Sequence, residues 1–292
     1  MRRIVETGSA SLALAADKTF GRYKKETPHE VRQADVQENA VLKELRNIWV
    51  RFKYGHDNED AAYIRVLELI RNLSVSAKDV ARFCIALAEF QDEKWFAHKA
   101  GLLLSALINN GNEEDYTIST KHLIKPPQDA VIYHLGFRNT KNIIIDGNGI
   151  TRVGHKMERG TIIVKGDVSA YAALEMQGGT IIIEGYGDYG SGDSMRGGEL
   201  IIKGDAGPYI GGSMEGGKIH VYGNAICQEF GRCIKGGLIV IEGNCGHDVG
   251  LAMAGGEIHI NGDYISLGVN KTGGKIFHKG KQIYPVSENA TD

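Results

Sequence analysis

Short runs of alternating apolar and polar residues recur through the second half of the chain at a nearly fixed interval. The runs begin at Asn142, Thr161, Thr180, Glu199, Lys218, Leu238, Glu257 and Lys275. The interval between successive starts is 18 to 20 residues and most often 19. A constant period of this length is typical of a solenoid, in which each repeat forms one coil that stacks on the next.

The second and fourth residues of each run are aliphatic, from Ile143 and Ile145 in the first run to Ile258 and Ile260 in the seventh, with His278 as the exception in the eighth. Because side chains alternate across a strand, these residues share one face, which we expect to point inward. Burial of each such side chain contributes about 1.5 to 3 kcal/mol before the entropy of ordering the chain. The stack is therefore predicted to have its own core.

Glycines mark two corners of each coil. The sixth position is glycine in all eight runs: Gly147, Gly166, Gly185, Gly204, Gly223, Gly243, Gly262 and Gly280. We expect these corner glycines to adopt positive φ angles, and the Asp or Asn that usually follows to bond nearby backbone in the turn. A Gly-Gly pair forms the second corner in most coils.

Five of the six methionines share one position of the repeat. They are Met157, Met176, Met195, Met214 and Met253. A flexible methionine side chain can fill an irregular interior next to a glycine corner, which is the interpretation that we favour. A ladder of sulfur atoms that binds copper(I) is the alternative.

Apolar residues at helical spacing dominate the first half of the chain. One helix carries Val41, Leu45, Ile48, Trp49 and Phe52, with Gly55 expected as its C-terminal cap. Further helices are predicted over residues 59–73, after a capping box of Ser76 and Asp79, and over residues 92–110. Short connections between them indicate an antiparallel bundle.

The change from a glycine-poor to a glycine-rich sequence predicts the domain organisation. Of 39 glycines, 33 lie at or after Gly147, and Pro126 and Pro127 mark the neighbourhood of the boundary. We expect a poorly defined N-terminal segment (1–35), a helical domain (36–125), a β-helix (126–285) and a C-terminal tail (286–292). The fold class is α+β with two domains, in which a helical bundle precedes a right-handed parallel β-helix of about seven to eight 19-residue coils.

Charge and composition narrow the class of partner. The net charge of -2 and the lack of a basic tract argue against nucleic acid as a partner. No apolar run approaches the roughly 18 residues of a membrane span. Four cysteines do not form a disulfide framework, so we expect a cytoplasmic protein.

The third position of each run faces outward, yet it begins as a stripe of isoleucine. The column reads Ile144, Ile163, Ile182, Ile201, His220, Val240, His259 and Phe277. A face in contact with water would be polar, so either the helical domain or a protein partner is expected to cover it. The candidate interface comprises the four isoleucines with His220 and His259. The two histidines lie roughly 10 Å apart at about 4.8 Å per coil, too far for one metal ion.

No catalytic, cofactor-binding or metal site is predicted in the repeat. Matches to Gly-x-Gly-x-x-Gly follow from the glycine content and lie between strands, where no dinucleotide motif belongs. Cys227, Cys233 and Cys245 with His247 lack the paired spacing of zinc sites, so packing or loop thiols are favoured over a metal centre. The alternative of a catalytic site between the helices and the β-helix would draw on His98, His122 and His134.

Two segments carry a resemblance to a known family. Gly204-Asp-Ala-Gly-Pro-Tyr-Ile-Gly-Gly-Ser-Met-Glu-Gly-Gly and Gly243-Asn-Cys-Gly-His-Asp-Val-Gly-Leu-Ala-Met-Ala-Gly-Gly resemble the GXGXG repeat found in one subunit of formylmethanofuran dehydrogenase and in the C-terminal domain of the glutamate synthase large subunit. The likeness covers about residues 141–285. It implies an architectural β-helix that holds catalytic subunits or domains together and contributes no catalytic residues.

The sequence thus predicts an assembly subunit or domain whose partners are protein subunits or further copies of the chain. If the protein belongs to an enzyme, we expect it to be the non-catalytic subunit of an oxidoreductase. Two alternatives remain: a stand-alone hydrolase or transferase with a site between the helices and the β-helix, and an accessory protein related to glutamate synthase.

Overall fold

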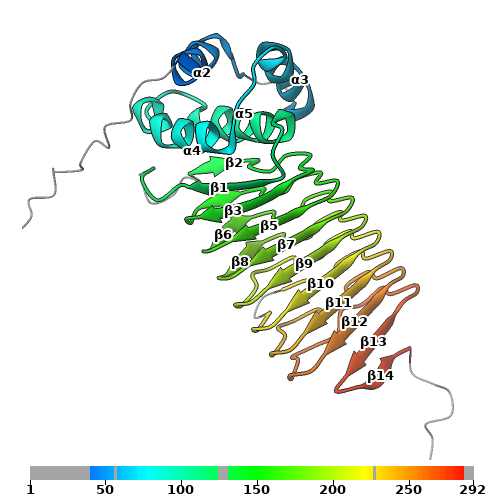
Figure 1. The fold of residues 1–292 in the computed structure, drawn as a ribbon. Helices are drawn as coiled ribbons and strands as arrows, with labels where there is room; N and C mark the ends of the chain where they lie inside the picture. The colour runs from blue at the N-terminus through cyan, green and yellow to red at the C-terminus, as the bar shows by residue number, and fades with distance from the viewer. Residues whose placement is uncertain (1–39, 56–57, 124–130, 226–227, 286–292) are drawn as a thin grey trace, which may run out of the picture. The chain divides into compact units, whose positions relative to one another are not determined.

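The computed structural model describes residues 40–55, 58–123, 131–225 and 228–285 (Figure 1). All of them belong to one compact unit, Glu38–Asp292. The predicted N-terminal segment and C-terminal tail lie outside the described residues, as does the Pro126-Pro127 pair.

The described helices agree with the periodicity of the first half. They are α2 (Ala40–Arg51), α3 (Glu59–Ile70), α4 (Ala77–Ala86), the short 3-10 helix η1 (Leu87–Phe90) and α5 (Phe96–Asn110). The predicted capping box begins α4, because Ser76 Oγ accepts from Asp79 N while the Asp79 side chain accepts from Ser76 N. Three boundaries differ from expectation, and the first is that α3 ends at Ile70 instead of residue 73. Helix α2 ends at Arg51, before Gly55, and α5 begins at Phe96 after a left-handed Trp95.

The second half forms a parallel β-solenoid whose coils stack in register (Figure 1). The larger sheet comprises β1 (Asp115–Ser119), β3 (Asn142–Asp146), β5 (Thr161–Val164), β7 (Thr180–Ile183), β9 (Glu199–Ile202), β10 (Lys218–Val221), β11 (Leu238–Ile241), β12 (Glu257–Ile260), β13 (Lys275–His278) and β14 (Lys281–Tyr284). The smaller sheet comprises β2 (Ile132–Tyr133), β4 (Ile150–Thr151), β6 (Val168–Ala170) and β8 (Gly187–Tyr189). All eight predicted run starts coincide with strand starts.

The larger sheet begins earlier than the sequence boundary suggested. Strand β1 pairs in parallel with β3, with Asp115 opposite Asn142 and Ser119 opposite Asp146. The partners are 27 residues apart, not 19, so the first coil contains more residues than the others. The segment expected to complete the helical domain therefore contributes the first strand of the solenoid.

The inward columns form the predicted core. The second and fourth residues of β3, β5, β7, β9, β10, β11 and β12 are at most 1% exposed, and only His278 in β13 departs from this pattern. All five methionines of the repeat are fully buried. Each lies beside the glycine corner of the following coil: a Cβ added to Gly198, for example, would lie 2.7 Å from Met176 Cε. Packing thus explains this column.

The glycines at the sixth position serve another purpose than the one predicted. Of the eight, only Gly147 and Gly280 have positive φ angles, whereas the second glycine of each Gly-Gly pair adopts the left-handed conformation, as at Gly217 (φ 86°). A Cβ at Gly204 would instead lie 2.7 Å from the carbonyl oxygen of Gly185 in the coil below. Glycine is needed there because successive backbones approach each other closely.

The Asp and Asn residues after these glycines also bond differently from the prediction. Five of the six side chains accept a hydrogen bond from the backbone of the next coil: Asp167 N donates to Asn148 Oδ1 (2.8 Å), for example, and Asn224 N donates to Asp205 Oδ1 (2.7 Å). Asp263 accepts from Lys279 Nζ instead. The bonds form a ladder parallel to the stack. The ladder supplies hydrogen-bond acceptors for the backbone N–H groups at the corner, which are not paired within either sheet.

The helices cover the first coils of the solenoid. Helix α4 packs on β1, and α5 packs on β2 and α3. Ser105 Oγ in α5 accepts from the amides of Gly136 (2.9 Å) and Phe137 (3.2 Å). These contacts close the open end of the apolar core. No helix in the described part of the chain is both long and apolar enough to cross a bilayer.

Close approach of the coils predicts a measurable cost for a single methyl group. Gly204→Ala should lower the free energy of unfolding by about 1 to 3 kcal/mol, because the added Cβ overlaps the Gly185 carbonyl. Gly55→Ala is the control, since its Cβ would meet nothing within 4 Å. Urea unfolding followed by circular dichroism measures both, and equal midpoints for the two variants would contradict the close-approach explanation.

Candidate interaction surface

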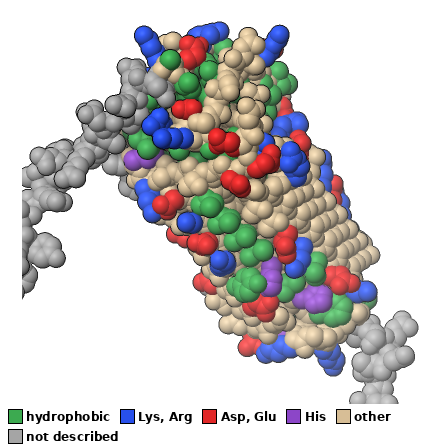
Figure 2. Space-filling view, viewed as in Figure 1, with side chains coloured by type: hydrophobic (Ala, Val, Ile, Leu, Met, Phe, Trp, Pro, Cys, Tyr) green, Lys and Arg blue, Asp and Glu red, His purple; other side chains and the backbone are tan. Residues whose placement is uncertain are grey.

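The predicted stripe of isoleucine lies on the outward face of the larger sheet. Strand register places Ile144, Ile163, Ile182 and Ile201 directly above one another, followed by His220. All five are half-buried, in contrast to the fully buried columns on either side of the strand centre. Figure 2 shows hydrophobic side chains that run along this face toward two histidines. The four isoleucines are called the isoleucine stripe below.

The described helices do not cover the isoleucine stripe. Their main contacts with the solenoid are made by α4 to β1 and by α5 to β2, so they lie over the end of the stack (Figure 1). Docking of the helical part on the stripe was the simplest explanation of its apolar character. The described contacts do not support that explanation, and the stripe remains without a cover among the described residues.

Both histidines of the candidate interface are held by their neighbours on the surface. His220 Nε2 lies 2.7 Å from Glu242 Oε1, and its ring stacks on Tyr222 with centroids 4.3 Å apart. Hydrogen bonds from Asn261 and His220 lower the pKa of Glu242. His259 stacks on Phe277 at 4.5 Å. The two histidines extend the isoleucine stripe as aromatic surface and do not converge on a common ligand.

The cysteines do not form a centre in the described structure. Cys245 is buried, and desolvation raises the pKa of its thiol to about 12, which keeps it protonated and unreactive. Cys233 is half-exposed and free, whereas Cys227 lies outside the described residues. Among the residues described, no three His, Cys, Asp or Glu side chains are grouped to hold a metal ion.

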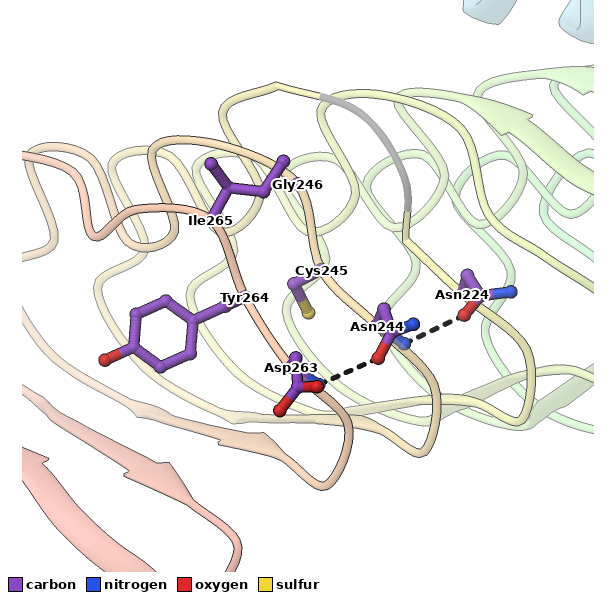
Figure 3. A pocket seen from close by; sticks show the side chains of 7 residues that line it. All are labelled: Asn224, Asn244, Cys245, Gly246, Asp263, Tyr264 and Ile265. Carbon is purple, nitrogen blue, oxygen red and sulfur yellow. Dashed lines mark hydrogen bonds between the residues drawn. The ribbon is translucent and has the colours of Figure 1, made fainter.

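Cys245 lines a pocket of about 420 Å³ at a corner of the solenoid, together with Asn224, Asn244, Gly246, Asp263, Tyr264 and Ile265. Figure 3 shows that Asn224, Asn244 and Asp263 belong to the corner ladder, whereas Tyr264 lies apart from it. Asn224 Oδ1 accepts from Asn244 N (2.9 Å), and Asn244 Oδ1 accepts from Asp263 N (2.8 Å). Lys279 pairs with Asp263 at 2.7 Å. Because these polar groups already bond to one another or to Lys279, few of them are left to bind a substrate.

A second site, at the junction of α3 with the first coils, contains a buried pair of histidines. His134 and His155 are 0% and 3% exposed, and their Nδ1 atoms lie 3.2 Å apart. Each Nε2 is buried without a hydrogen-bond partner among the described residues. Glu59 and Glu175 approach these Nε2 atoms at 3.5 and 3.6 Å. We call His134 and His155 the histidine pair.

The histidine pair is held under a network of ions that joins α3 to the coils. Arg152 pairs with Glu59 at 2.8 Å. Asp60 accepts from Arg138 at 2.8 Å and from Lys156 at 2.6 Å. Hydrogen bonds and charge from these two cations outweigh desolvation and lower the pKa of Asp60. The network fixes the helix on the solenoid and separates the histidine pair from water.

Burial determines the charge of the histidine pair. Desolvation, reinforced by the neighbouring His155 and Arg152, lowers the pKa of His134 to about 2. Desolvation also lowers the pKa of His155, to about 4, although Glu175 opposes this effect. Both rings are therefore neutral near pH 7. One ring donates its Nδ1 proton to the Nδ1 of the other.

The structure brings together some of the histidines that the sequence suggested and separates others. His98 stacks on Tyr133 with centroids 4.3 Å apart and lies 5.9 Å from the His134 ring. His122 is elsewhere, with Nε2 2.9 Å from the carbonyl oxygen of Cys84. The sequence did not single out His155. One signal was present in the sequence: Leu135-Gly-Phe aligns with Val153-Gly-His, and the structure places these segments in neighbouring coils. This alignment sets His155 opposite Phe137, three residues after His134.

Comparison with known proteins adds no family to this description. Neither a scan against protein-family models nor a search of curated proteins finds a match to the chain.

The histidine pair predicts a fall in stability in mild acid. The pKa of each ring is lower in the folded chain than the ordinary 6.5. In mild acid the unfolded chain therefore binds more protons than the folded chain. The stabilisation is therefore complete above pH 6.5 and is lost as the pH falls toward 4, at up to about 1.4 kcal/mol per pH unit for each ring.

Urea unfolding between pH 6.5 and 4.5 tests this prediction. The double variant with His134→Gln and His155→Gln should lose most of the slope of unfolding free energy against pH. His247→Gln, at an exposed histidine, should retain it. A wild-type slope that persists in the double variant would show that other groups cause it.

Proposed function

We propose that this protein is a non-catalytic assembly subunit or domain, a β-solenoid scaffold that holds protein subunits against the outward face of its larger sheet. The observation that carries the proposal is the isoleucine stripe, which remains partly exposed although the inner columns of the same strands are fully buried. Removal of apolar surface from water is favourable by about 25 cal/mol per Å². A protein surface placed on this face would gain that free energy.

The rigidity of the stack also supports a scaffold. Successive coils are tied together by inward side chains, nearly all of them aliphatic, and by parallel strand pairing, and most of them also by the corner ladder. A surface built this way keeps its side chains at fixed spacing, which reduces the entropy lost when a partner binds. The helices and their ion pairs close one end of the stack, and these described helices do not pack on the sheet face.

The resemblance to the GXGXG-repeat subunit of formylmethanofuran dehydrogenase and to the C-terminal domain of the glutamate synthase large subunit agrees with this role. It rests on the coincidence of glycines, Asp or Asn residues and methionines in register along the repeat. On that basis we further propose a place beside catalytic subunits of an oxidoreductase, in the cytoplasm, with no cofactor of its own.

A catalytic site at the junction of helices and solenoid is the second candidate. The approach of His98, His134 and His155 to one another supports it. Burial argues against it, because neither ring of the histidine pair reaches solvent. Turnover of a substrate by the purified chain, lost in His134→Gln with the fold intact, would establish this alternative.

The assembly role predicts that a charge in the isoleucine stripe releases the partners. The tagged chain carrying Ile163→Asp and Ile182→Asp, purified from its source cells, should have the mass of a single chain, whereas the wild type should carry other subunits at fixed stoichiometry. Native mass spectrometry measures both.

Ile64→Asp is the matched control, because Ile64 is 56% exposed on α3, outside the sheet. It should leave the assembly intact. A double Asp variant that keeps all partners would contradict the proposal, as would a wild-type chain that is isolated alone and is active by itself.

A further inference from the structure

The larger sheet presents three outward columns, formed by the first, third and fifth residues of successive coils. The third column contains the isoleucine stripe. The fifth column alternates in charge beside it: Asp146, Lys165, Glu184 and Lys203, whose amides continue the strand ladder. These side chains are exposed or half-exposed; Lys203 and Glu184, for example, are 53% and 43% exposed. An apolar centre bordered by charges is typical of a protein interface.

This order of charges is self-complementary when the stack is reversed. A two-fold axis along the strand direction, placed between β5 and β7, sets β5 of one copy against β7 of the other and β3 against β9. Asp146 then lies opposite Lys203, and Lys165 lies opposite Glu184. Because the interface is two-fold symmetric, each pair occurs twice.

The other two columns match under the same operation. In the third column Ile144 meets Ile201 and Ile163 meets Ile182, so the isoleucine stripe covers itself. In the first column, Asp115 of β1 lies opposite Lys218 of β10. The remaining first-column pairs are Asn142 with Glu199 and Thr161 with Thr180. No two like charges face each other in any column.

A hollow at one end of the face fits the same arrangement. A cavity of about 280 Å³ lies over β1 and β3, lined by Thr117, Asn142, Ile144 and Ile163 among others. Reversal of the stack sets Thr117 opposite His220 of the second copy. The imidazole of His220 is larger than the side chain of Thr117, and in the second copy it faces the hollow that Thr117 lines.

We propose that a second copy of this chain docks on the isoleucine stripe, antiparallel and face to face, with the two-fold axis between β5 and β7. This inference rests on the proposed function and identifies a second copy of the chain as the subunit that covers the isoleucine stripe. Sheets that pack face to face lie about 10 Å apart with strands within about 30° of each other, which lets the outward columns meet as described. The unreversed arrangement sets the first column against the fifth and offers one opposite-charge pair, Glu199 with Lys203, so it is disfavoured.

Alternating charges also stabilise a single stack, and the test must separate the two effects. Glu184 and Lys203 already pair at 3.4 Å within one chain. Lys165→Glu should raise the Kd of the dimer by about tenfold or more, which corresponds to 1.4 kcal/mol, because it sets two carboxylates face to face across the axis. Adding Glu184→Lys restores opposite charges across the axis but leaves like-charged neighbours within each chain. Recovery of the dimer in the double variant is therefore specific to pairing between copies.

Sedimentation velocity of the full chain over a concentration series measures the dimer, with circular dichroism melting to confirm the fold of each variant. Lys43→Glu, at an exposed lysine on α2, is the control and should leave the Kd unchanged. A wild-type chain that stays monomeric would overturn self-pairing, as would a dimer insensitive to Lys165→Glu or one that the double variant fails to restore. If the chain is monomeric while Ile163→Asp with Ile182→Asp still removes other subunits from the native assembly, self-pairing fails and the scaffold role stands.

Discussion

Close contact between successive coils is the constraint on which the whole structure depends. Strands that pair in parallel lie about 4.8 Å apart, so every column of the solenoid must repeat a side chain that fits directly above itself. At the corners this distance leaves no room for a Cβ, and glycine is required even where φ is negative, as at Gly204. On the strands the same distance stacks isoleucine on isoleucine, both inside the coil and on its outer face.

This constraint explains both the stability and the proposed role of the protein. A stack of similar coils forms a long surface without folding back on itself, and in its described part no three His, Cys, Asp or Glu side chains converge on a common point. The helices close one end, and the β13–β14 hairpin lies at the other end of the larger sheet. The sheet face between these ends carries the isoleucine stripe, and its size and charge pattern make it suitable for another protein surface.

The sequence predicted the repetitive features well because they depend on local spacing. The strand starts, the inward columns, the methionine packing and the capping box at Ser76 all follow from periodicity or from residues a few positions apart. Features that depend on contacts between coils were missed. The role of the sixth-position glycines, the ladder from Asn148 onward and strand β1 at Asp115 arise from neighbours 19 or 27 residues away. The histidine pair belongs to the same group, since His155 meets His134 only when coils stack.

Hydroxyl-radical footprinting of the native assembly, read by mass spectrometry, tests most directly the central claim that the sheet face is an interface. We predict that Ile144, Ile163, Ile182 and Ile201 are oxidised more slowly in the assembly than in the dissociated chain, while exposed Tyr189 on the smaller sheet is oxidised equally in both. Equal oxidation of the four isoleucines in the two states would contradict the claim.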